Sequence, residues 1–322
     1  MTVPTVKLTH LDSLWFQVSG TLCNIACAHC FNNSGPNVRT FSFLSLEKVR
    51  AELAAAAKAC VKEVFFTGGE PFLHPQLPEM LEMSLGTAPT TVLTNGMLIN
   101  DRIADRLAAI ERGARYSLEI RVSLDGYSEE MNDAIRGKGV FRQALAATAR
   151  LSRRGLLPLV TIVHTWRDEE DLRTLAGFRE LLEKAGYSRP RIKVLPSLPL
   201  GRELARSPEL ASDQSLLTED MLEGFDRDLL MCSNSRVVTD RGVWVCPLLV
   251  EKTDARLGSS LEYSAAAYRL VHHACVTCYQ YGTICSNVSG EIEGSGRKPS
   301  LRGQIPHSAG VHQFRESSPE EL

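Results

Sequence analysis

The stretch "SGTLCNIACAHCFNNSGP", residues 19–36, holds three cysteines within eight positions: Cys23, Cys27 and Cys30. A tetrahedral structural zinc site uses four protein ligands. A [4Fe–4S] cluster has four iron corners, each usually held by a thiolate. Three thiols on one loop therefore either share a site with a ligand from elsewhere in the chain, as for zinc, or leave one iron of a cluster free for another molecule.

Outward from this stretch, β-rich and helical segments alternate. Strands are predicted at 15–20, 63–69, 90–96, 118–126, 157–166 and 190–196; helices are predicted at 44–60, 76–86, 101–113, 129–155 (as two helices) and 168–186. Such alternation is typical of parallel βαβ units, which curl into a barrel or part of one. The motifs "TGGEP" (67–71), "TNG" (94–96) and "SLDG" (123–126) follow three of these strands. Because parallel strands end at one edge, these motifs and the cysteine loop predict a single active-site mouth.

Composition narrows the classes of protein. The formal charge of −2 over 322 residues gives no sign of binding to nucleic acid or to a membrane surface. No apolar run reaches the roughly 18 residues of a membrane span, and the N-terminus lacks the apolar core of a signal peptide. We therefore expect a cytoplasmic protein, whose nine cysteines serve as metal ligands or reactive thiols rather than in disulfides.

The remaining cysteines lie mostly near the C-terminus. Cys60 is predicted to be a small core residue of the helix at 44–60, whereas the other five form a second group: Cys232, Cys246, Cys275, Cys278 and Cys285. Around them we predict a helix at 221–230, a hairpin at 235–247, a helix-like segment at 260–272 and a cysteine-bearing loop. The expected division is a barrel at 1–205, an auxiliary cluster domain at 206–286 and a Gly/Ser/Pro-rich tail at 287–322.

The Cys-x3-Cys-x2-Cys loop, followed by "TGGEP", "TNG" and "SLDG", resembles the radical S-adenosylmethionine (SAM) superfamily over residues 15–196. The resemblance implies a partial (β/α)6 barrel with a small C-terminal α+β iron–sulfur domain. It implies that Cys23, Cys27 and Cys30 hold a [4Fe–4S] cluster whose open iron chelates SAM. Reductive cleavage of SAM then yields a 5′-deoxyadenosyl radical, which removes a hydrogen atom from the substrate.

The same resemblance implies a set of SAM-binding residues. The backbone at Gly68 and Gly69, with Glu70, corresponds to the cradle for the SAM amino group; a simple strand-to-loop turn is the alternative. Further contacts to SAM are implied for Asn95, Ser123, Asp125, Arg136 and Leu195. Asn95 could instead be a left-handed turn residue, and Arg136 a solvated arginine at a helix end. His29 departs from the family pattern, which has an aromatic residue before the third cysteine, against the adenine edge.

The second cysteine group resembles the auxiliary-cluster domains called twitch and SPASM, and five cysteines suffice for one further [4Fe–4S] cluster; a structural zinc is the alternative. One thiol is then left over. The twitch pattern favours Cys232, Cys246, Cys275 and Cys278 as ligands and leaves Cys285 spare. Yet Cys246 ends a predicted strand, a rigid place from which to aim a thiol at a substrate. Our prediction assigns Cys246 as a hydrogen donor, and Cys232, Cys275, Cys278 and Cys285 as ligands.

A spare thiol favours epimerisation, in which the thiol returns a hydrogen atom to the opposite face of the substrate. About 14 residues precede the first strand, too few for the extra peptide-binding domain of many peptide-modifying members. We therefore expect a small-molecule substrate, an aminoglycoside-like sugar in antibiotic biosynthesis, and a flavodoxin or ferredoxin as reductant. The alternatives are a two-electron dehydrogenase like that of butirosin tailoring, and a maturase of ribosomal peptides. An iron–sulfur electron carrier or sensor represents a different class.

Overall fold

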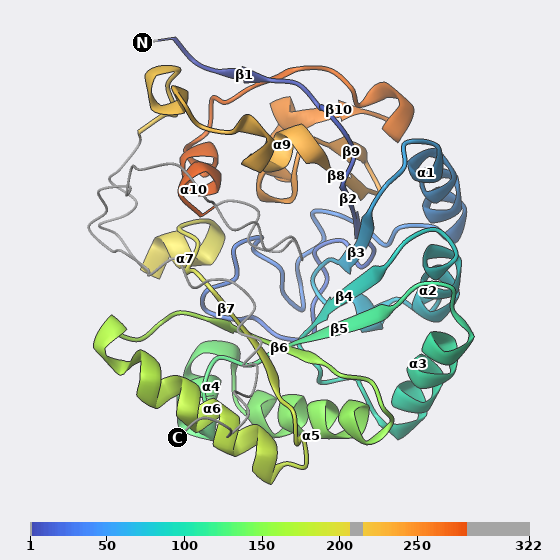
Figure 1. Cartoon of the computed structure of the whole chain (residues 1–322), viewed down its shortest axis with the longest axis vertical. Helices are drawn as coiled ribbons and strands as arrows, with labels where there is room; N and C mark the ends of the chain where they lie inside the picture. The colour runs from blue at the N-terminus through green and yellow to red at the C-terminus, as the bar shows by residue number, and fades with distance from the viewer. Residues whose placement is uncertain (1, 207–214, 282–322) are drawn as a thin grey trace, which may run out of the picture.

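The computed structural model describes residues 2–206 and 215–281 (Figure 1). Six parallel strands form its centre, and helices pack along their outer side, so the predicted α/β fold is confirmed. The strands are β2 (Ser13–Gln17), β3 (Glu63–Thr67), β4 (Thr90–Thr94), β5 (Leu118–Ser123), β6 (Leu159–Val163) and β7 (Arg191–Leu195). The helices are α1 (Leu46–Lys58), α2 (Leu77–Leu85), α3 (Asp101–Gly113), α4 (Glu129–Arg136), α5 (Val140–Arg153) and α6 (Asp171–Lys184).

Local side-chain bonds fix where these helices begin. The Ser45 hydroxyl accepts a hydrogen bond from the Lys48 amide at the start of α1, and Asn100 caps α3 in the same way. Ser128 caps α4 through the amide of Met131. At the far end of α1, Cys60 is exposed and has a φ of +56°, so the prediction of a core residue was wrong: the helix ends at Lys58 and the chain turns outward.

The core follows from the two-residue period of the strands. Leu14, Phe16 and Val64 face the helices and are fully buried in the main hydrophobic cluster. The alternate residues Trp15 and Phe65 face the other side, where their rings stack at 4.1 Å. Both faces of the sheet are therefore packed, as expected for a parallel sheet.

The C-terminal segment extends this sheet. Strand β8 (Ser235–Thr239) pairs in parallel with β2, and β9 (Gly242–Trp244) and β10 (Arg256–Gly258) follow it antiparallel, giving the order β10-β9-β8-β2-β3-β4-β5-β6-β7. The predicted hairpin at 235–247 is therefore present, with its turn before Gly242, whose φ is +126°. The barrel sheet and the hairpin are one continuous hydrogen-bonded surface.

Three predictions for this segment were wrong. The expected helix at 221–230 is two 3₁₀ turns, η3 (Asp220–Leu222) and η4 (Arg227–Leu229), separated at Gly224, whose φ of +71° no helix permits. The helix-like stretch at 260–272 contains β11 (Tyr268–Arg269), which pairs with β1 (Thr5–Val6), so a tertiary contact outweighs its alanine-rich composition. Of the expected cysteine-bearing loop at 275–285, residues 275–281 belong to the helix α10 (His273–Tyr281), and the rest lies outside the described residues.

The N-terminal residues are bonded to the C-terminal segment. Besides the β1–β11 pair, the amides of Thr9 and Asp12 donate to the carbonyls of Ser233 and Asn234, at 2.8 Å each. These bonds cross the predicted boundary at 205, whose place remains a prediction. The predicted tail at 287–322 lies outside the described residues.

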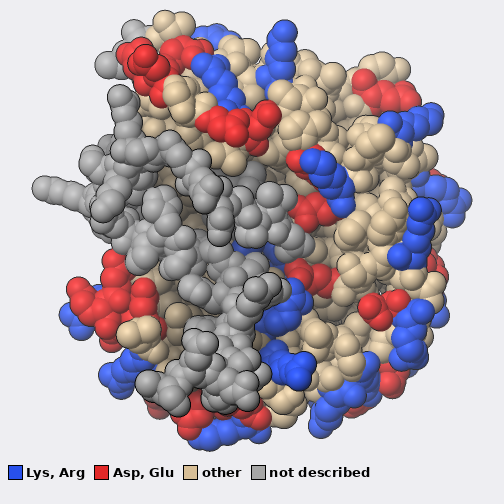
Figure 2. Space-filling model, viewed as in Figure 1, with Lys and Arg blue, Asp and Glu red and all other residues tan. Residues whose placement is uncertain are grey.

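The surface carries a mixture of charges. On the face shown in Figure 2, acidic and basic side chains alternate over the described residues. None of the helices within residues 2–206 and 215–281 has the length and apolarity that a membrane crossing requires.

Candidate functional site

The first cysteine loop leaves the carboxyl end of β2 and is closed by backbone bonds. The Cys23 amide donates to the Gly35 carbonyl at 3.2 Å, and the Gly35 amide donates back to Thr21 at 3.1 Å. Cys23 and Cys27 are buried and Cys30 is half-buried. All three belong to one small contact cluster with Ile25 and Val140, so the fold brings the predicted thiols together.

A second element fastens this loop from a distant part of the chain. In α7 (Gly201–Arg206), the Arg202 side chain donates to the carbonyls of Cys27 at 2.8 Å and Ser34 at 2.7 Å. The Arg202 amide donates to the Cys30 carbonyl at 2.9 Å. Gly201 has a φ of +56°, and a Cβ there would lie 2.3 Å from the Phe31 carbonyl oxygen. Sequence reasoning missed Arg202, because no motif marks a contact between positions so far apart.

The glycines of "TGGEP" pack against the cysteine loop. A Cβ on Gly69 would lie 2.1 Å from the Leu22 carbonyl oxygen, and one on Gly68, whose φ is +145°, would lie 2.3 Å from the Ser19 hydroxyl. The amides of Gly69 and Glu70 donate to the Gly20 and Leu22 carbonyls at 2.9 and 3.0 Å. Only glycine permits this approach, so the motif joins β3 to the cysteine loop.

The carboxylate of Glu70 is fully buried and ties β3 to β4. It accepts hydrogen bonds from Thr94 Oγ1 at 2.7 Å, the Asn95 amide at 2.8 Å and the Phe72 amide at 3.1 Å. Burial nevertheless raises the pKa of this carboxyl to about 7, against the effect of those bonds. Both oxygens of Glu70 are therefore engaged within the protein, and its position shapes the strand ends.

Asn95 contacts the cysteine loop through its side chain. Its amide group donates to Asn24 Oδ1 at 2.7 Å and lies 3.7 Å from the Cys23 sulfur. The left-handed residue of this turn is Gly96, with a φ of +77°, and not Asn95. Of the two interpretations given above for Asn95, the turn residue is therefore the one that the backbone contradicts.

Asp125, His29 and Arg136 form a buried charged group. One carboxylate oxygen of Asp125 lies 2.6 Å from both His29 Nε2 and Arg136 Nε, and the other accepts from the Val163 amide at 2.8 Å. Burial opposes ionisation of Asp125, but Arg136 and His29 outweigh it and lower the pKa of this carboxyl to about 2. The carboxylate is therefore ionised at neutral pH.

This group reaches the cysteine loop through Arg136, which is buried rather than solvated and whose terminal nitrogen lies 4.0 Å from the Cys27 sulfur. The resemblance had suggested separate contacts to SAM for His29, Asp125 and Arg136, and it missed that His29 and Arg136 both bind Asp125. The departure at His29 was the available signal, because an imidazole can be protonated and then form an ion pair with a carboxylate, which no phenylalanine, tyrosine or tryptophan ring can do.

Ser123 and Leu195 lie at the carboxyl ends of β5 and β7, further along the sheet. Ser123 is half-buried, with its hydroxyl 3.4 Å from that of Thr161. The Leu195 carbonyl accepts a bond from the His164 amide at 2.8 Å. Both therefore share the predicted active-site edge of the sheet, although these hydrogen bonds go to β6 and to the residue after it, and not to the cysteine loop.

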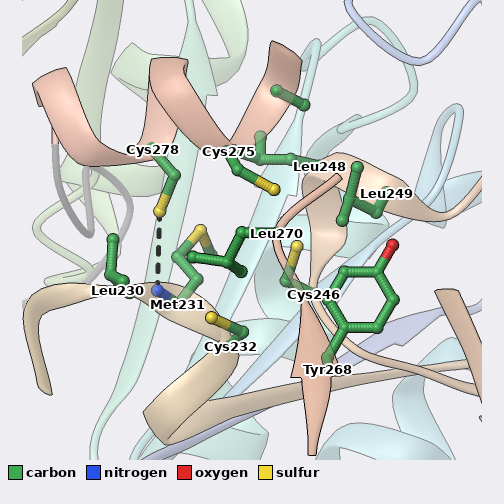
Figure 3. A pocket seen from close by; sticks show the side chains of 11 residues that line it. Leu230, Met231, Cys232, Cys246, Leu248, Leu249, Tyr268, Leu270, Cys275 and Cys278 are labelled. Atoms are coloured by element: carbon green, nitrogen blue, oxygen red, sulfur yellow. Dashed lines mark hydrogen bonds between the residues drawn. The ribbon is translucent and has the colours of Figure 1, made fainter. Parts of the chain in front are cut away.

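The second cysteine group surrounds an apolar pocket (Figure 3). Cys275 and Cys278, one helical turn apart on α10, point toward Cys232 of α9 (Met231–Asn234) and toward Cys246, two residues past the end of the strand β9. Leucine side chains, Met231 and Tyr268 supply most of the remaining wall. All four thiols are buried, and the Met231 amide lies 3.5 Å from the Cys278 sulfur.

Cys246 thus stands among the predicted ligands and not apart from them. The arrangement favours the alternative set of Cys232, Cys246, Cys275 and Cys278 over our assignment of Cys246 as a lone hydrogen donor. Cys285, the cysteine that this set leaves over, lies outside the described residues.

The thiols at both sites suit a metal cluster. Burial raises the pKa of Cys23 and Cys275 to about 12 and that of Cys278 to about 11, and it raises those of Cys27, Cys232 and Cys246 as well. Such thiols lose their protons when a metal binds the thiolates. Within the described residues, no three metal-binding side chains converge on a point suited to one ion. A [4Fe–4S] cluster does not need that, because each thiolate binds a different iron.

The family model of the radical SAM superfamily matches residues 18–182, which include this loop and most of the barrel. The chain belongs to the radical SAM superfamily. It is therefore a radical SAM enzyme, whose cofactors are SAM and a [4Fe–4S] cluster. The second group of buried cysteines fits a small iron–sulfur domain.

Two curated proteins and one solved structure show what this chain is similar to. The mycofactocin maturase MftC of Mycobacterium ulcerans is 31% identical over 177 residues, 54% of this chain and 45% of that protein. The GTP 3′,8-cyclase of Chlorobaculum tepidum is 32% identical over 133 residues, 40% and 38% of the two chains. Among solved structures, Streptococcus suis SuiB bound to its precursor peptide SuiA has a TM-score of 0.59 at 15% identity, covering 81% and 66% of the two chains. The chain spans less than half the length of either curated relative, so these matches identify a superfamily and not a substrate.

Proposed function

We propose that this protein is a peptide maturase of the radical SAM superfamily, acting on a precursor peptide. The observation that carries the proposal is the match to the maturase MftC, and the likeness in fold to SuiB, whose structure holds a precursor peptide, supports it. Our expectation of an epimerase for aminoglycoside-like sugars finds no such support among these relatives. The proposed partners are a peptide substrate and a flavodoxin or ferredoxin as reductant.

The first site holds the cluster that cleaves SAM. Cys23, Cys27 and Cys30 would hold three irons of this cluster and leave its fourth iron for SAM. When bound, the cluster would supply the electron for the reductive cleavage of SAM. Arg202 keeps the loop in its closed form through the carbonyls of Cys27 and Ser34, at 2.8 and 2.7 Å.

Arg136 is the proposed partner of the SAM carboxylate. The Asp125 carboxylate lies 2.6 Å from Arg136 Nε, and a terminal nitrogen of Arg136 lies 4.0 Å from the Cys27 sulfur. The guanidinium is therefore oriented toward the cysteine loop before SAM binds. His29, which belongs to the cysteine loop, also bonds to the Asp125 carboxylate. Gly68, Gly69 and Glu70 shape the neighbouring strand ends, and Asn95, Ser123 and Leu195 complete the proposed binding edge.

The second site holds the auxiliary cluster. We assign its four ligands as Cys232, Cys246, Cys275 and Cys278, because these thiols come from three segments to line one buried pocket. Cys246 is then a ligand and cannot also donate a hydrogen atom. If the reaction needs a thiol, the remaining candidate is Cys285.

A small-molecule substrate is the second candidate, since the GTP 3′,8-cyclase relative acts on a nucleotide. Under this alternative the same two clusters serve, and epimerisation or dehydrogenation of a sugar stays open. The two candidates differ in what stimulates SAM cleavage.

The test uses the anaerobically reconstituted full chain with SAM and dithionite. It is offered a panel of synthetic precursor peptides and, separately, a panel of aminoglycosides and nucleotides. A maturase should release 5′-deoxyadenosine faster with a peptide, and that peptide should change in mass. Stimulation by a sugar or a nucleotide alone would contradict the proposal.

The ligand assignment has its own test. Wild-type protein should hold about eight irons per chain. Cys246→Ala should hold about four, whereas Cys285→Ala and the matched control Cys60→Ala, at an exposed thiol, should keep about eight. A Cys246→Ala protein with full iron content would restore Cys246 as a free thiol.

A further inference from the structure

The Arg236 side chain is buried directly behind two of the auxiliary cysteines. It extends from β8 and is fully buried. Its guanidinium donates to the carbonyls of Cys232 at 2.9 Å and Val245 at 3.4 Å. One of these carbonyls belongs to a ligand cysteine and the other to the residue before Cys246. Two further bonds go to the carbonyls of Ser235 at 2.7 Å and Ser264 at 2.9 Å.

This cation has no carboxylate partner among the described residues. All the hydrogen bonds of its guanidinium go to backbone carbonyl oxygens, and an arginine guanidinium keeps its positive charge in proteins. The other fully buried arginine, Arg121, lies 2.8 Å from the Glu119 carboxylate. A buried charge is costly unless an opposite charge compensates it. Arg236 therefore calls for a negative charge in the pocket beside it.

We propose that Arg236 is the counter-charge of the auxiliary cluster, which steadies the Cys232 and Cys246 segments and raises the reduction potential of the cluster. The proposal rests on the ligand set proposed above. Four thiolates give a [4Fe–4S] cluster a net negative charge, and reduction adds another. A fixed positive charge nearby stabilises the reduced form more than the oxidised form. The auxiliary cluster thereby becomes a better electron acceptor.

The effect is specific to one cluster. The guanidinium bonds hold α9 and the segment before Cys246, and its hydrogen bonds do not go to residues 19–36. Arg236 should therefore change the potential of the auxiliary cluster and leave that of the SAM-binding cluster almost unchanged. A purely structural arginine would instead affect how much iron is held, without moving a potential.

The experiment is a potentiometric titration of the reconstituted holoenzyme, followed by electron paramagnetic resonance. Addition of SAM identifies the signal of the first cluster. Arg236→Gln removes the charge and keeps some hydrogen bonds, whereas Arg236→Lys keeps the charge. Arg241→Gln is the matched control, because Arg241 is exposed at the turn of the same hairpin. We expect a lower auxiliary potential in Arg236→Gln, a value near wild type in Arg236→Lys, and no change in the control.

Equal auxiliary potentials in wild type and Arg236→Gln would overturn the proposal. If Arg236→Gln fails to hold the auxiliary iron, Arg236→Lys decides the question. Iron retained by Arg236→Lys would support a role for the positive charge, whereas an equal loss of iron would overturn the proposal, because it would show that only the hydrogen bonds matter. Failure of the ligand set looks different. Wild type would then hold about four irons, or Cys246→Ala would keep both signals.

Discussion

Replacing Asp125 by asparagine should destabilise the barrel by about 3 kcal/mol. The carboxylate lies 2.6 Å from both Arg136 and His29 and is fully buried. Removing one partner of a buried ion pair costs roughly 3–5 kcal/mol. A second route starts from the pKa, which falls from the ordinary 3.8 to about 2. At about 1.4 kcal/mol per pH unit, that difference is worth ~2.5 kcal/mol. We take the lower end, because asparagine can keep the bond from the Val163 amide.

The assay is thermal unfolding of the reconstituted protein, followed by circular dichroism. With roughly 2–4 °C per kcal/mol for a domain of this size, Asp125→Asn should unfold about 6–12 °C below wild type. The matched control is Asp101→Asn. Asp101 makes a similar pair with Arg154, at 2.8 Å, but on the surface, where such pairs are worth about 0–1 kcal/mol. If both variants lose the same few degrees, the argument from burial fails.

The pH dependence of the same group has a definite sign. The pKa of Asp125 is lower in the folded than in the unfolded chain, so its contribution is complete above 3.8 and is lost as the pH falls through about 2. Urea midpoints of the apoproteins should therefore differ between wild type and Asp125→Asn by the same amount at pH 7 and pH 5, and by less below pH 3.8. If the difference in urea midpoint became smaller between pH 7 and pH 5, the pH dependence would belong to another group and not to Asp125.

Three further predictions concern the two cysteine sites. Gly69→Ala should push the first cysteine loop away, because its Cβ would lie 2.1 Å from the Leu22 carbonyl oxygen. The variant should therefore hold about four irons fewer than wild type, whereas the control Gly113→Ala, whose Cβ meets nothing within 4 Å, should keep its iron. Arg202→Ala removes two charged hydrogen bonds, worth ~1.5–3 kcal/mol each, so a chelator should strip the first cluster faster, whereas Arg206→Ala should behave like wild type. Removing iron should loosen residues 230–281 before the barrel, so a protease should cut apoprotein there first; equal resistance of apo- and holoprotein would count against a structural role for the auxiliary cluster.

The barrel could be predicted from the sequence because its signals are local. Each strand from β2 to β7 is a short β-rich run, three of the helices (α1, α3 and α4) begin at a capping side chain, and parallel strands must end at one edge. The shared edge is enough to predict that Cys23, Gly69, Asn95 and Asp125 lie near one another, without any knowledge of distances. The ends of the strands were predicted less well, since several predicted strands continue past the true ends into the functional loops.

The remaining features depend on contacts between distant residues. Nothing local marks Arg202 as a partner of Cys27, or Arg236 as a buried cation behind Cys246. Residues 268–269 became a strand because β1 lies beside them, against the preference of the alanines that precede them. The role of Cys246 also could not be read from spacing, because a thiol at the end of a strand suits either use. Its three cysteine neighbours in the pocket favour the use as a ligand.

The pairing of β8 with β2 has a consequence for the order in which the molecule assembles. β2 ends at Gln17 and is synthesised well before β8, which begins at Ser235. Until then one edge of β2 has no partner, and an open strand edge invites pairing with other chains. Pairing across such a separation also slows folding, because the long intervening chain must first be brought together. A nascent chain that ends at residue 205 would contain the strands β2 to β7 but not β8, which covers the free edge of β2. We therefore expect the barrel to need the C-terminal segment, or a chaperone, to be protected from aggregation.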